Sequence, residues 1–408
     1  MKKTIFTRAI LLVSFVSLFT DISSEMLYPV MPVYLRSIGF TVLLIGILEG
    51  VAEATAGLSK GYFGHLSDRL RRRVPFIRGG YSLSTLSKPM LAAFTWPWWI
   101  FLARTFDRLG KGIRTSARDA LLSDETTPEN KGKVFGFHRA MDTFGAAIGP
   151  LTALLFLAFF PGHYRWLFLI AFGPGLLAVA LTFVLREKKV TRSTSHQVTN
   201  SPRVTFLSFL SYWTSATPAY RLLVIGLLAF CLFNSSDVFL LLALKNSRLS
   251  DTAMIGFYIF YNIVYAGFSF PLGALADRIG LKSVLVGGFA VFAGVYFFMG
   301  FASTIPVFGI LFLFYGIYAA ATEGISRALL TNQAGKEETA TALGFYNSFA
   351  SVLTLAASTL AGILWYAAGP RVMFVISGTG VLLVVVYLVV IFRKSRTQNT
   401  QNKQIFTE

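Results

Sequence analysis

Charged residues are scarce in this chain, and their scarcity excludes an ordinary soluble fold. Only 14% of the 408 residues are charged, whereas 54% are hydrophobic. A soluble domain carries roughly a quarter of its residues as charges. A helix that crosses a membrane needs about 20 mainly apolar residues, and the chain is long enough for many such spans. The composition therefore predicts a polytopic membrane protein.

Residues that build catalytic and redox sites are also few. The single cysteine, Cys231, lies in an apolar run, so no intrachain disulfide can form. The four histidines are scattered, and the chain has no His-Glu-x-x-His and no phosphate-binding Gly-x-x-x-x-Gly-Lys-Ser/Thr sequence. A membrane enzyme is the rival interpretation that these absences disfavour. We therefore expect no enzyme activity, no catalytic residue, no cofactor, no metal site and no direct use of ATP.

The formal net charge of +18 raises the question of a nucleic-acid partner. With the N-terminus on the cytoplasmic side, Lys and Arg of the connecting segments fall mostly on that side, which is the positive-inside bias. The basic excess is therefore interpreted as topology, with anionic membrane lipid as a partner and no nucleic acid. The predicted spans are 9–34, 41–63, 76–94, 98–122, 134–159, 166–185, 221–244, 254–272, 283–301, 305–330, 343–365 and 373–392, with both termini cytoplasmic.

Two segments half a chain apart repeat each other. Residues 64–69 read Gly-His-Leu-Ser-Asp-Arg, and residues 273–278 read Gly-Ala-Leu-Ala-Asp-Arg. Residues 23–25 (Ser-Ser-Glu) correspond in the same way to residues 235–237 (Ser-Ser-Asp). Such repetition indicates a duplicated six-helix unit, whose ligand site is expected between the halves. The predicted parts are an N-terminal bundle (1–185), a cytoplasmic linker (186–220), a C-terminal bundle (221–392) and a cytoplasmic tail (393–408).

The linker is polar and basic but contains one apolar pattern. Phe206, Phe209, Leu210 and Trp213 recur at i, i+3, i+4 and i+7. This spacing predicts a short amphipathic helix that lies on the cytoplasmic leaflet. An unstructured linker is the alternative.

Three motifs resemble the major facilitator superfamily. Residues 64–73 match its cytoplasmic gating motif, except that Arg71 stands where the family usually has a glycine. The fifth span contains Gly145, Gly149 and Pro150, which resemble a motif of exporters that exchange substrate for protons, although Ala153 replaces the usual last glycine. The sequence Asp-Ile-Ser-Ser-Glu-Met at 21–26 resembles a prokaryotic branch of the superfamily.

The resemblance implies the fold and the gating residues. The expected fold is an all-α membrane protein with twelve transmembrane helices in two pseudo-symmetric six-helix bundles. By the resemblance, Asp68 with Arg69 steadies the outward-facing state, and Asp277 with Arg278 forms a weaker second latch. A basic loop that only sets topology is the alternative. The expected gating residues are Gly64, Asp68, Arg69, Arg72, Gly273, Asp277 and Arg278.

The fourth span is unusually charged for a transmembrane helix. Its basic residues fall mostly on one helical stripe. Each central Arg or Lys exposed to lipid would cost roughly 2.5–3.5 kcal/mol, so the stripe must face protein or water. Carboxylates on neighbouring spans are expected to pair with it, either for proton exchange or only to hold the helices in register. The candidate substrate and proton-coupling residues are Asp21, Glu25, Glu49, Glu53, Arg104, Asp107, Arg108, Lys111, Arg139, Asp142, Asn234, Asp237, Glu323 and Arg327.

These features together favour a secondary transporter over a channel, because duplicated gating loops suit alternating access. We expect proton-coupled export of a small organic solute by a monomer in the inner membrane, chiefly from the fifth-span motif. Import of an anionic metabolite is the alternative.

Overall fold

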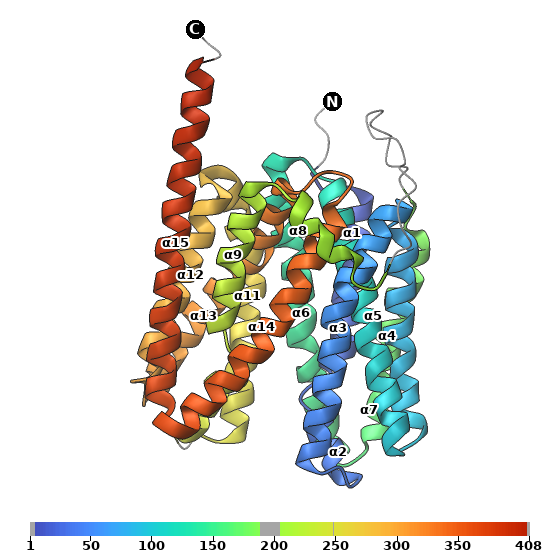
Figure 1. The fold of residues 1–408 in the computed structure, drawn as a ribbon. Coiled ribbons are helices and arrows are strands. Elements are labelled where there is room, and N and C mark those ends of the chain that lie inside the picture. The colour runs from blue at the N-terminus through green and yellow to red at the C-terminus, as the bar shows by residue number, and fades with distance from the viewer. Residues whose placement is uncertain (1–4, 188–204, 248, 406–408) are drawn as a thin grey trace. The chain divides into compact units, whose positions relative to one another are not determined.

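The computed structural model describes residues 5–187, 205–247 and 249–405, so residues 188–204 of the expected linker lie outside it. All regular elements of these described residues are helical (Figure 1). The first half contains α1 (Arg8–Glu25), α2 (Met31–Ser37), α3 (Val42–Leu70), α4 (Val74–Ala93), α5 (Pro97–Asp124), η1 (Pro128–Asn130), α6 (Lys131–Phe159) and α7 (Tyr164–Val184). Two short elements follow, η2 (Ser208–Ser211) and α8 (Tyr212–Ser215). The second half contains α9 (Pro218–Phe233), α10 (Val238–Asn246), α11 (Asp251–Ile279), α12 (Leu281–Met299), α13 (Ile305–Gln333), α14 (Thr339–Ala368) and α15 (Pro370–Ile405).

Eight segments of the described chain are long and apolar enough to cross a membrane. They correspond to α6, α7, the pair α9–α10, and α11 to α15. The other long helices of the first half, α1, α3, α4 and α5, carry the intramembrane charges predicted from the sequence. Polar side chains lower the apolarity of these four helices, so they depend on burial of their charges against protein.

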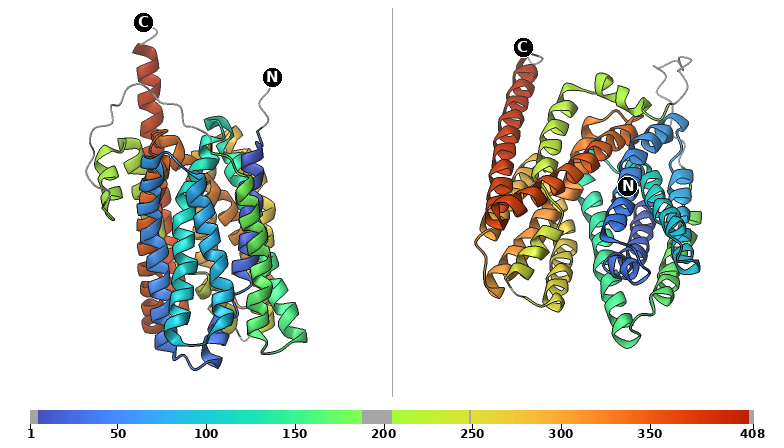
Figure 2. Two further views of the ribbon diagram at one scale, coloured as in Figure 1. Left: turned by 90° about the vertical axis from the view of Figure 1, so that its right-hand side faces the viewer. Right: turned by 60° about the horizontal axis from the view of Figure 1, so that its bottom comes forward.

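The two halves pack their helices in the same order. In the first half, α5 packs against α3 and α4, and α7 packs against α4 and α1. In the second half, α13 packs against α11 and α12, and α15 packs against α12 and α9. Helices α3, α4 and α5 run side by side in Figure 1 and in the left view of Figure 2. The internal repeat of the sequence is therefore repeated in the packing.

Helix starts also correspond between the halves. The side chains of Thr7 and Thr217 cap α1 and α9 by accepting the backbone N–H three residues on. Thr41 and Ser250 cap α3 and α11 in the same way. A hydroxyl side chain at this position satisfies a backbone donor that the helix itself cannot pair. These boundaries are thus set locally by the sequence.

Both repeated Ser-Ser-acid sequences lie where a helix is interrupted. Helix α1 ends at Glu25, and the chain turns before α2 begins at Met31. Helix α9 ends at Phe233, and α10 begins at Val238, so Asp237 stands at the break. The sequence predicts one continuous span in each place. The mean hydropathy of an apolar run stays high when the helix within it is interrupted for only a few residues. Broken membrane helices expose backbone groups and often mark binding sites.

The chain separates into two compact units that do not coincide with the two halves. One unit contains residues 1–128, 137–216 and 334–351, and the other contains residues 129–136, 217–333 and 352–408. The beginning of α14 therefore belongs with the first-half helices, and the beginning of α6 belongs with the second-half helices. Contacts at these two exchanged segments involve the expected gating residues.

The linker pattern produces helix, and its apolar residues are covered only in part: Phe206 and Leu210 are exposed, whereas Phe209 packs on protein. The Phe209 side chain is 2% exposed and lies against Gly61 of α3. The Trp213 ring stacks on Phe345 of α14 with the centroids 5.6 Å apart. The predicted membrane contact of Phe209 is therefore replaced by contact with α3. Periodicity identifies an apolar face, but it does not identify what covers that face.

Candidate functional site

The charged stripe of α5 is buried in protein, as the insertion cost predicts. The side chains of Arg104, Arg114 and Arg118 are each buried, whereas Lys111 of the same helix is exposed. Helix α5 lies between α3 and α4, which supply acceptors on both sides. A buried guanidinium needs such partners because desolvation of the charge is otherwise too costly.

One group of ion pairs joins α3, α4 and α5. Arg104 Nη2 donates to both carboxylate oxygens of Glu49, at 2.6 and 2.8 Å. Lys88 Nζ donates to Asp107 Oδ1 at 2.6 Å and to Ser24 Oγ at 3.2 Å. The fork geometry of the guanidinium suits a carboxylate and holds the pair in one orientation. Two helix neighbours of α5 are thus fixed to it by charge.

Arg108 makes looser contacts in the same region. Its Nη2 is 4.0 Å from Glu49 Oε2, and its Nη1 is 4.0 Å from Glu53 Oε2. The Glu53 side chain is 50% exposed. Such a carboxylate can exchange its partner more readily than the closely held Glu49, because long, exposed ion pairs contribute little energy.

A second group of charges joins α1, α5 and α6. Arg118 donates to Asp119 Oδ1 at 3.0 Å and lies 3.6 Å from Asp142, while Arg139 donates to Asp142 Oδ2 at 2.6 Å. The Asp21 carboxyl of α1 lies near that of Asp142. Two acids and two arginines therefore meet between α1, α5 and α6.

The fifth-span motif brings α6 close to α1. A side chain at Gly145 would meet the Leu18 carbonyl oxygen at 2.5 Å, and one at Gly149 would meet the Met26 nitrogen at 2.7 Å. Only glycine permits such an approach between two backbones. Pro150 lies inside α6. The motif thus positions Asp142 beside α1, near the end of that helix.

The second bundle has a different polar site at the α9–α10 break. Asp237 accepts hydrogen bonds from the hydroxyls of Tyr261 at 2.8 Å and Tyr315 at 2.6 Å. Glu323 and Arg327 lie on α13, with Arg327 Nη2 3.9 Å from Glu323 Oε2. Asn234, at the same break, has a buried side-chain oxygen without a hydrogen-bond partner. The sequence does not pair these tyrosines with Asp237, because they lie on two helices remote from it.

The expected gating aspartates each bind the beginning of a helix. Asp68 accepts hydrogen bonds from the backbone N–H groups of Ala340 at 3.3 Å and Thr341 at 2.5 Å, and from the Thr341 hydroxyl at 2.6 Å. Asp277 accepts from the backbone N–H groups of Gly132 at 2.8 Å and Lys133 at 2.9 Å. Unpaired N–H groups and partial positive charge at a helix start favour a carboxylate there.

A glycine in each motif allows the start of the partner helix to approach closely. A Cβ at Gly64 would collide with the Ala340 carbonyl oxygen, and one at Gly273 would collide with that of Gly132. The repeated glycine and aspartate of each motif therefore act together. The glycine admits the partner helix, and the aspartate binds its first N–H groups.

The arginine that pairs with Asp68 is Arg73, which sequence analysis did not select. Arg73 Nη1 lies 2.5 Å from Asp68 Oδ1, and its Nε donates to Asp124 Oδ2 at 3.3 Å. Burial alone would lower the pKa of Arg73, but the two carboxylates raise it above its ordinary value. Arg69, Arg72 and Arg278 are exposed. The run of arginines signals a basic loop, but only the turn at residue 71 decides which of them points inward.

Arg71, which stands where the family motif usually has glycine, adopts a backbone conformation that glycine favours. It is the one non-glycine among the described residues with positive φ, at 51°, in the left-handed conformation that ends α3. Gly280 takes a positive φ of 103° at the end of α11. Glycine is favoured at such positions because it has no Cβ. The Arg71 guanidinium lies 3.3 Å from Glu337, a contact that glycine could not make.

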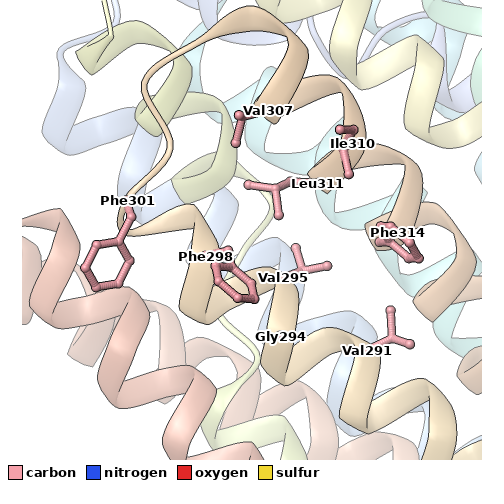
Figure 3. A pocket seen from close by; sticks show the side chains of 9 residues that line it. All are labelled: Val291, Gly294, Val295, Phe298, Phe301, Val307, Ile310, Leu311 and Phe314. Carbon is pink, nitrogen blue, oxygen red and sulfur yellow. The ribbon is translucent and has the colours of Figure 1, made fainter.

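Two other features do not form polar sites. A groove of about 570 Å³ between α12 and α13 is lined only by apolar residues, including Val291, Phe298 and Phe314 (Figure 3). It has no polar group that would orient a charged solute. Residues 57–61 have the Gly-x-Ser-x-Gly spacing of a hydrolase motif, but Ser59 is buried within α3, not on the strand-to-helix turn that the chemistry needs. No metal-binding group of three or more His, Cys, Asp or Glu occurs in the part of the chain that the structure describes.

Comparisons with known proteins agree with this architecture. The Major Facilitator Superfamily profile matches residues 13–260 and 249–407. An uncharacterized MFS-type transporter of Methanocaldococcus jannaschii is 33% identical over 368 residues, which cover 88% of this chain and 89% of that protein. A probable 4-methylmuconolactone transporter of Cupriavidus pinatubonensis is 26% identical over 254 residues, covering 61% of this chain and 58% of that protein.

Solved structures share the fold at low sequence identity. The human organic anion transporter MFSD10 aligns with a TM-score of 0.75 and 17% identity, covering 93% of this chain and 99% of that one. The Escherichia coli fucose:proton symporter FucP also aligns with a TM-score of 0.75, at 11% identity, covering 93% and 97%. The predicted all-α membrane fold with twelve transmembrane helices is confirmed. The chain is a multi-pass membrane transporter that belongs to the Major Facilitator Superfamily.

Proposed function

We propose that this protein is a proton-coupled secondary transporter that exports a small organic solute by alternating access. The observation that carries the proposal is the buried charge network of the first bundle. Asp142 lies between Arg118 and Arg139, Arg108 lies between Glu49 and Glu53, and the fifth-span glycines let α6 approach α1 closely. Intramembrane acid–base networks of this kind carry protons in pumps and transporters.

Within that network, the acids differ in how firmly they are held. Glu49 is bound by both oxygens to Arg104, so we assign it mainly to holding α3 against α5. Glu53 is half exposed and 4.0 Å from Arg108, and Glu25 makes no ion pair within the described residues. Loosely held acids can change their charged neighbours when access alternates. We therefore propose Glu25 and Glu53 as the acids that exchange protons beside Arg108 and Lys111.

We further propose that Asp68 and Asp277 are latches that open and close with access from the cytoplasm. Asp68 makes three hydrogen bonds to the start of α14 and is paired with Arg73. Asp277 makes two hydrogen bonds to the start of α6, and no ion pair to it occurs in the described residues. Asp68 is therefore the stronger latch. Breaking either contact frees the end of a helix, which is what an opening on that side requires.

We also propose the membrane location, oligomeric state and topology that the sequence predicts. The protein resides in the inner membrane as a monomer, with both termini in the cytoplasm and anionic lipid around its basic loops. Residues 1–185 and 221–392 form the two transport bundles, and residues 186–220 link them. The distribution of Lys and Arg supports this orientation.

Amide variants of Glu25, Glu49 and Glu53 in proteoliposomes test the coupling. At a coupling acid, the amide should abolish uphill transport driven by an imposed pH gradient, yet preserve substrate binding and downhill exchange. At a structural acid, the amide should lower folded protein and binding together. We expect the first behaviour for Glu25→Gln and Glu53→Gln, and the second for Glu49→Gln. If all three variants still drive uphill transport at the wild-type rate, coupling through this cluster is wrong.

Import of an anionic metabolite is the second candidate function. It is favoured by Lys111, whose side chain is exposed on the otherwise buried stripe of α5. An exposed ammonium in a transport path would attract a negatively charged solute. The direction of a proton-dependent flux of organic anions into right-side-out vesicles separates this candidate from export.

A further inference from the structure

Asp237 differs from the paired acids of the first bundle because its partners are neutral. Both carboxylate oxygens accept hydrogen bonds from tyrosine hydroxyls, Oδ2 from Tyr261 and Oδ1 from Tyr315. Among the residues that the structure describes, none forms an ion pair with Asp237. In the first bundle, by contrast, Glu49, Asp107 and Asp142 all contact cations. The described residues therefore provide no cation that would neutralise a charge on Asp237.

A second acid lies on a helix that contacts Asp237. Glu323 acts on Asp237 through its charge and is on the same helix as Tyr315. The guanidinium of Arg327 is 3.9 Å from Glu323, one turn farther along α13, and offsets that second charge. Asp237 is therefore the carboxylate that would favour a cation over an anion here.

Aromatic rings surround the carboxylate. The Tyr261 ring lies 5.4 Å from the Tyr315 ring and 5.5 Å from the Tyr258 ring, and Tyr296 lies 6.5 Å from Tyr315. Tyrosine faces attract organic cations, and recognition of quaternary ammonium groups commonly uses several such rings. The combination of one carboxylate with tyrosine rings therefore favours an alkylated ammonium over a hydrated metal ion.

The helix break supplies a further unfilled acceptor. The side-chain oxygen of Asn234 is buried and has no hydrogen-bond partner. Asn234 and Asp237 lie within the same four-residue interruption between α9 and α10. A buried acceptor without a donor is costly, and an N–H or O–H group of a ligand would satisfy it.

We propose that the second bundle contains a binding subsite for a monovalent organic ammonium, with Asp237 as its counter-ion and Tyr261 and Tyr315 as its orienting groups. This inference rests on the proposed transport function, since it names the solute class as organic cations. The hydroxyls of the two tyrosines hold the carboxylate in one orientation, and their rings face the alkyl groups of the ligand. Proton coupling by the first bundle is a separate property.

Equilibrium binding to the full-length protein in nanodiscs tests the proposal without depending on transport. The probes are choline, benzyltrimethylammonium and 3,3-dimethylbutan-1-ol, which is a neutral isostere of choline. We expect both cations to bind the wild type and the neutral isostere to bind at least about tenfold more weakly, because it lacks the charge. This comparison needs no variant, so it stands even where a substitution impairs folding.

Three variants locate the site. Asp237→Asn should weaken binding of both cations by about tenfold or more, since a contact with a charged group is lost. Tyr315→Phe keeps the ring and should weaken binding less. Glu129→Gln changes an exposed acid of the same compact unit and should leave binding unchanged.

Several results would overturn the assignment. These are a wild type that binds neither cation, a neutral isostere that binds as tightly as choline, or unchanged cation affinity in folded Asp237→Asn protein. Uphill transport driven by a pH gradient, measured in parallel, would then show whether the proposed transport function survives the failure.

Discussion

Replacement of Asp68 by asparagine should release the start of α14. The carboxylate accepts three hydrogen bonds from Ala340 and Thr341 and pairs with Arg73. Asparagine keeps one accepting oxygen, but its NH2 group faces donors. Loss of one member of a buried ion pair costs about 3–5 kcal/mol. Because Arg73 retains Asp124 at 3.3 Å, we expect the lower value, about 3 kcal/mol, which corresponds to on the order of 100-fold in the equilibrium.

Hydrogen exchange of the full-length protein measures this opening directly. In Asp68→Asn, the amides of Ala340 and Thr341 should exchange on the order of 100-fold faster, a factor that follows from the same energy. The matched variant Asp277→Asn should instead increase exchange at Gly132 and Lys133, and by a smaller factor, because Asp277 has two hydrogen bonds and no arginine partner within the described residues. Transport should be slowed strongly by the first variant and mildly by the second.

The reasoning about the latch would be refuted by two results at equal amounts of inserted protein. One is unchanged exchange at Ala340 and Thr341 in Asp68→Asn. The other is a transport rate equal to that of the wild type. If both aspartate variants increase exchange at the same amides, the contacts are not independent latches.

Three further predictions follow from contacts of single side chains. Phe209→Ala should speed amide hydrogen exchange in η2 and α8, because truncation of a buried Phe costs about 3–5 kcal/mol; equal exchange in Phe209→Ala and in the exposed-site control Leu210→Ala would contradict the packing. Lys88→Met should lower the melting temperature in detergent by the cost of a broken buried pair, about 3 kcal/mol, since Asp107 keeps only the longer contact with Arg104 at 3.7 Å; the addition of Asp107→Leu should restore most of the loss. Arg71→Gly should melt higher than Arg71→Ala, because only glycine relieves the positive φ, by about 1 kcal/mol; a higher melting temperature for the alanine variant would argue against strain there.

For the charged residues, the sequence predicts the environment of a helix but not the partner of each side chain. The cost of exposing Arg104 or Arg118 to lipid predicts that the α5 stripe faces protein or water, and these two side chains are buried. The same reasoning does not assign partners. Arg104 pairs with Glu49, but the cation closest to Asp107 is Lys88 of α4, which the sequence does not assign to it. Each candidate acid had several cations within plausible reach, and only the rotation of each helix about its axis selects among them.

In the gating motif, too, the sequence identifies some of the residues and the structure adds the others. Repetition of glycine and aspartate in the two halves identified Asp68 and Asp277. It did not identify Arg73 or Thr341, because the left-handed turn at Arg71 directs the arginines and because α14 is remote in the sequence. Nor did it predict that Tyr261 and Tyr315 donate to Asp237, because 15% of the residues are aromatic and most aromatic side chains serve packing.

The sequence by itself determined the membrane class, the duplication, the capped helix starts and the need to bury the charges of α5. These properties depend on composition and on neighbours within about one helical turn, which the linear order specifies. Only the tertiary structure decided which carboxylate meets which cation, what covers Phe209 and which hydroxyls hold Asp237. Those contacts join residues that are far apart in the chain, and their energies change steeply with distances of an ångström, which packing between helices sets.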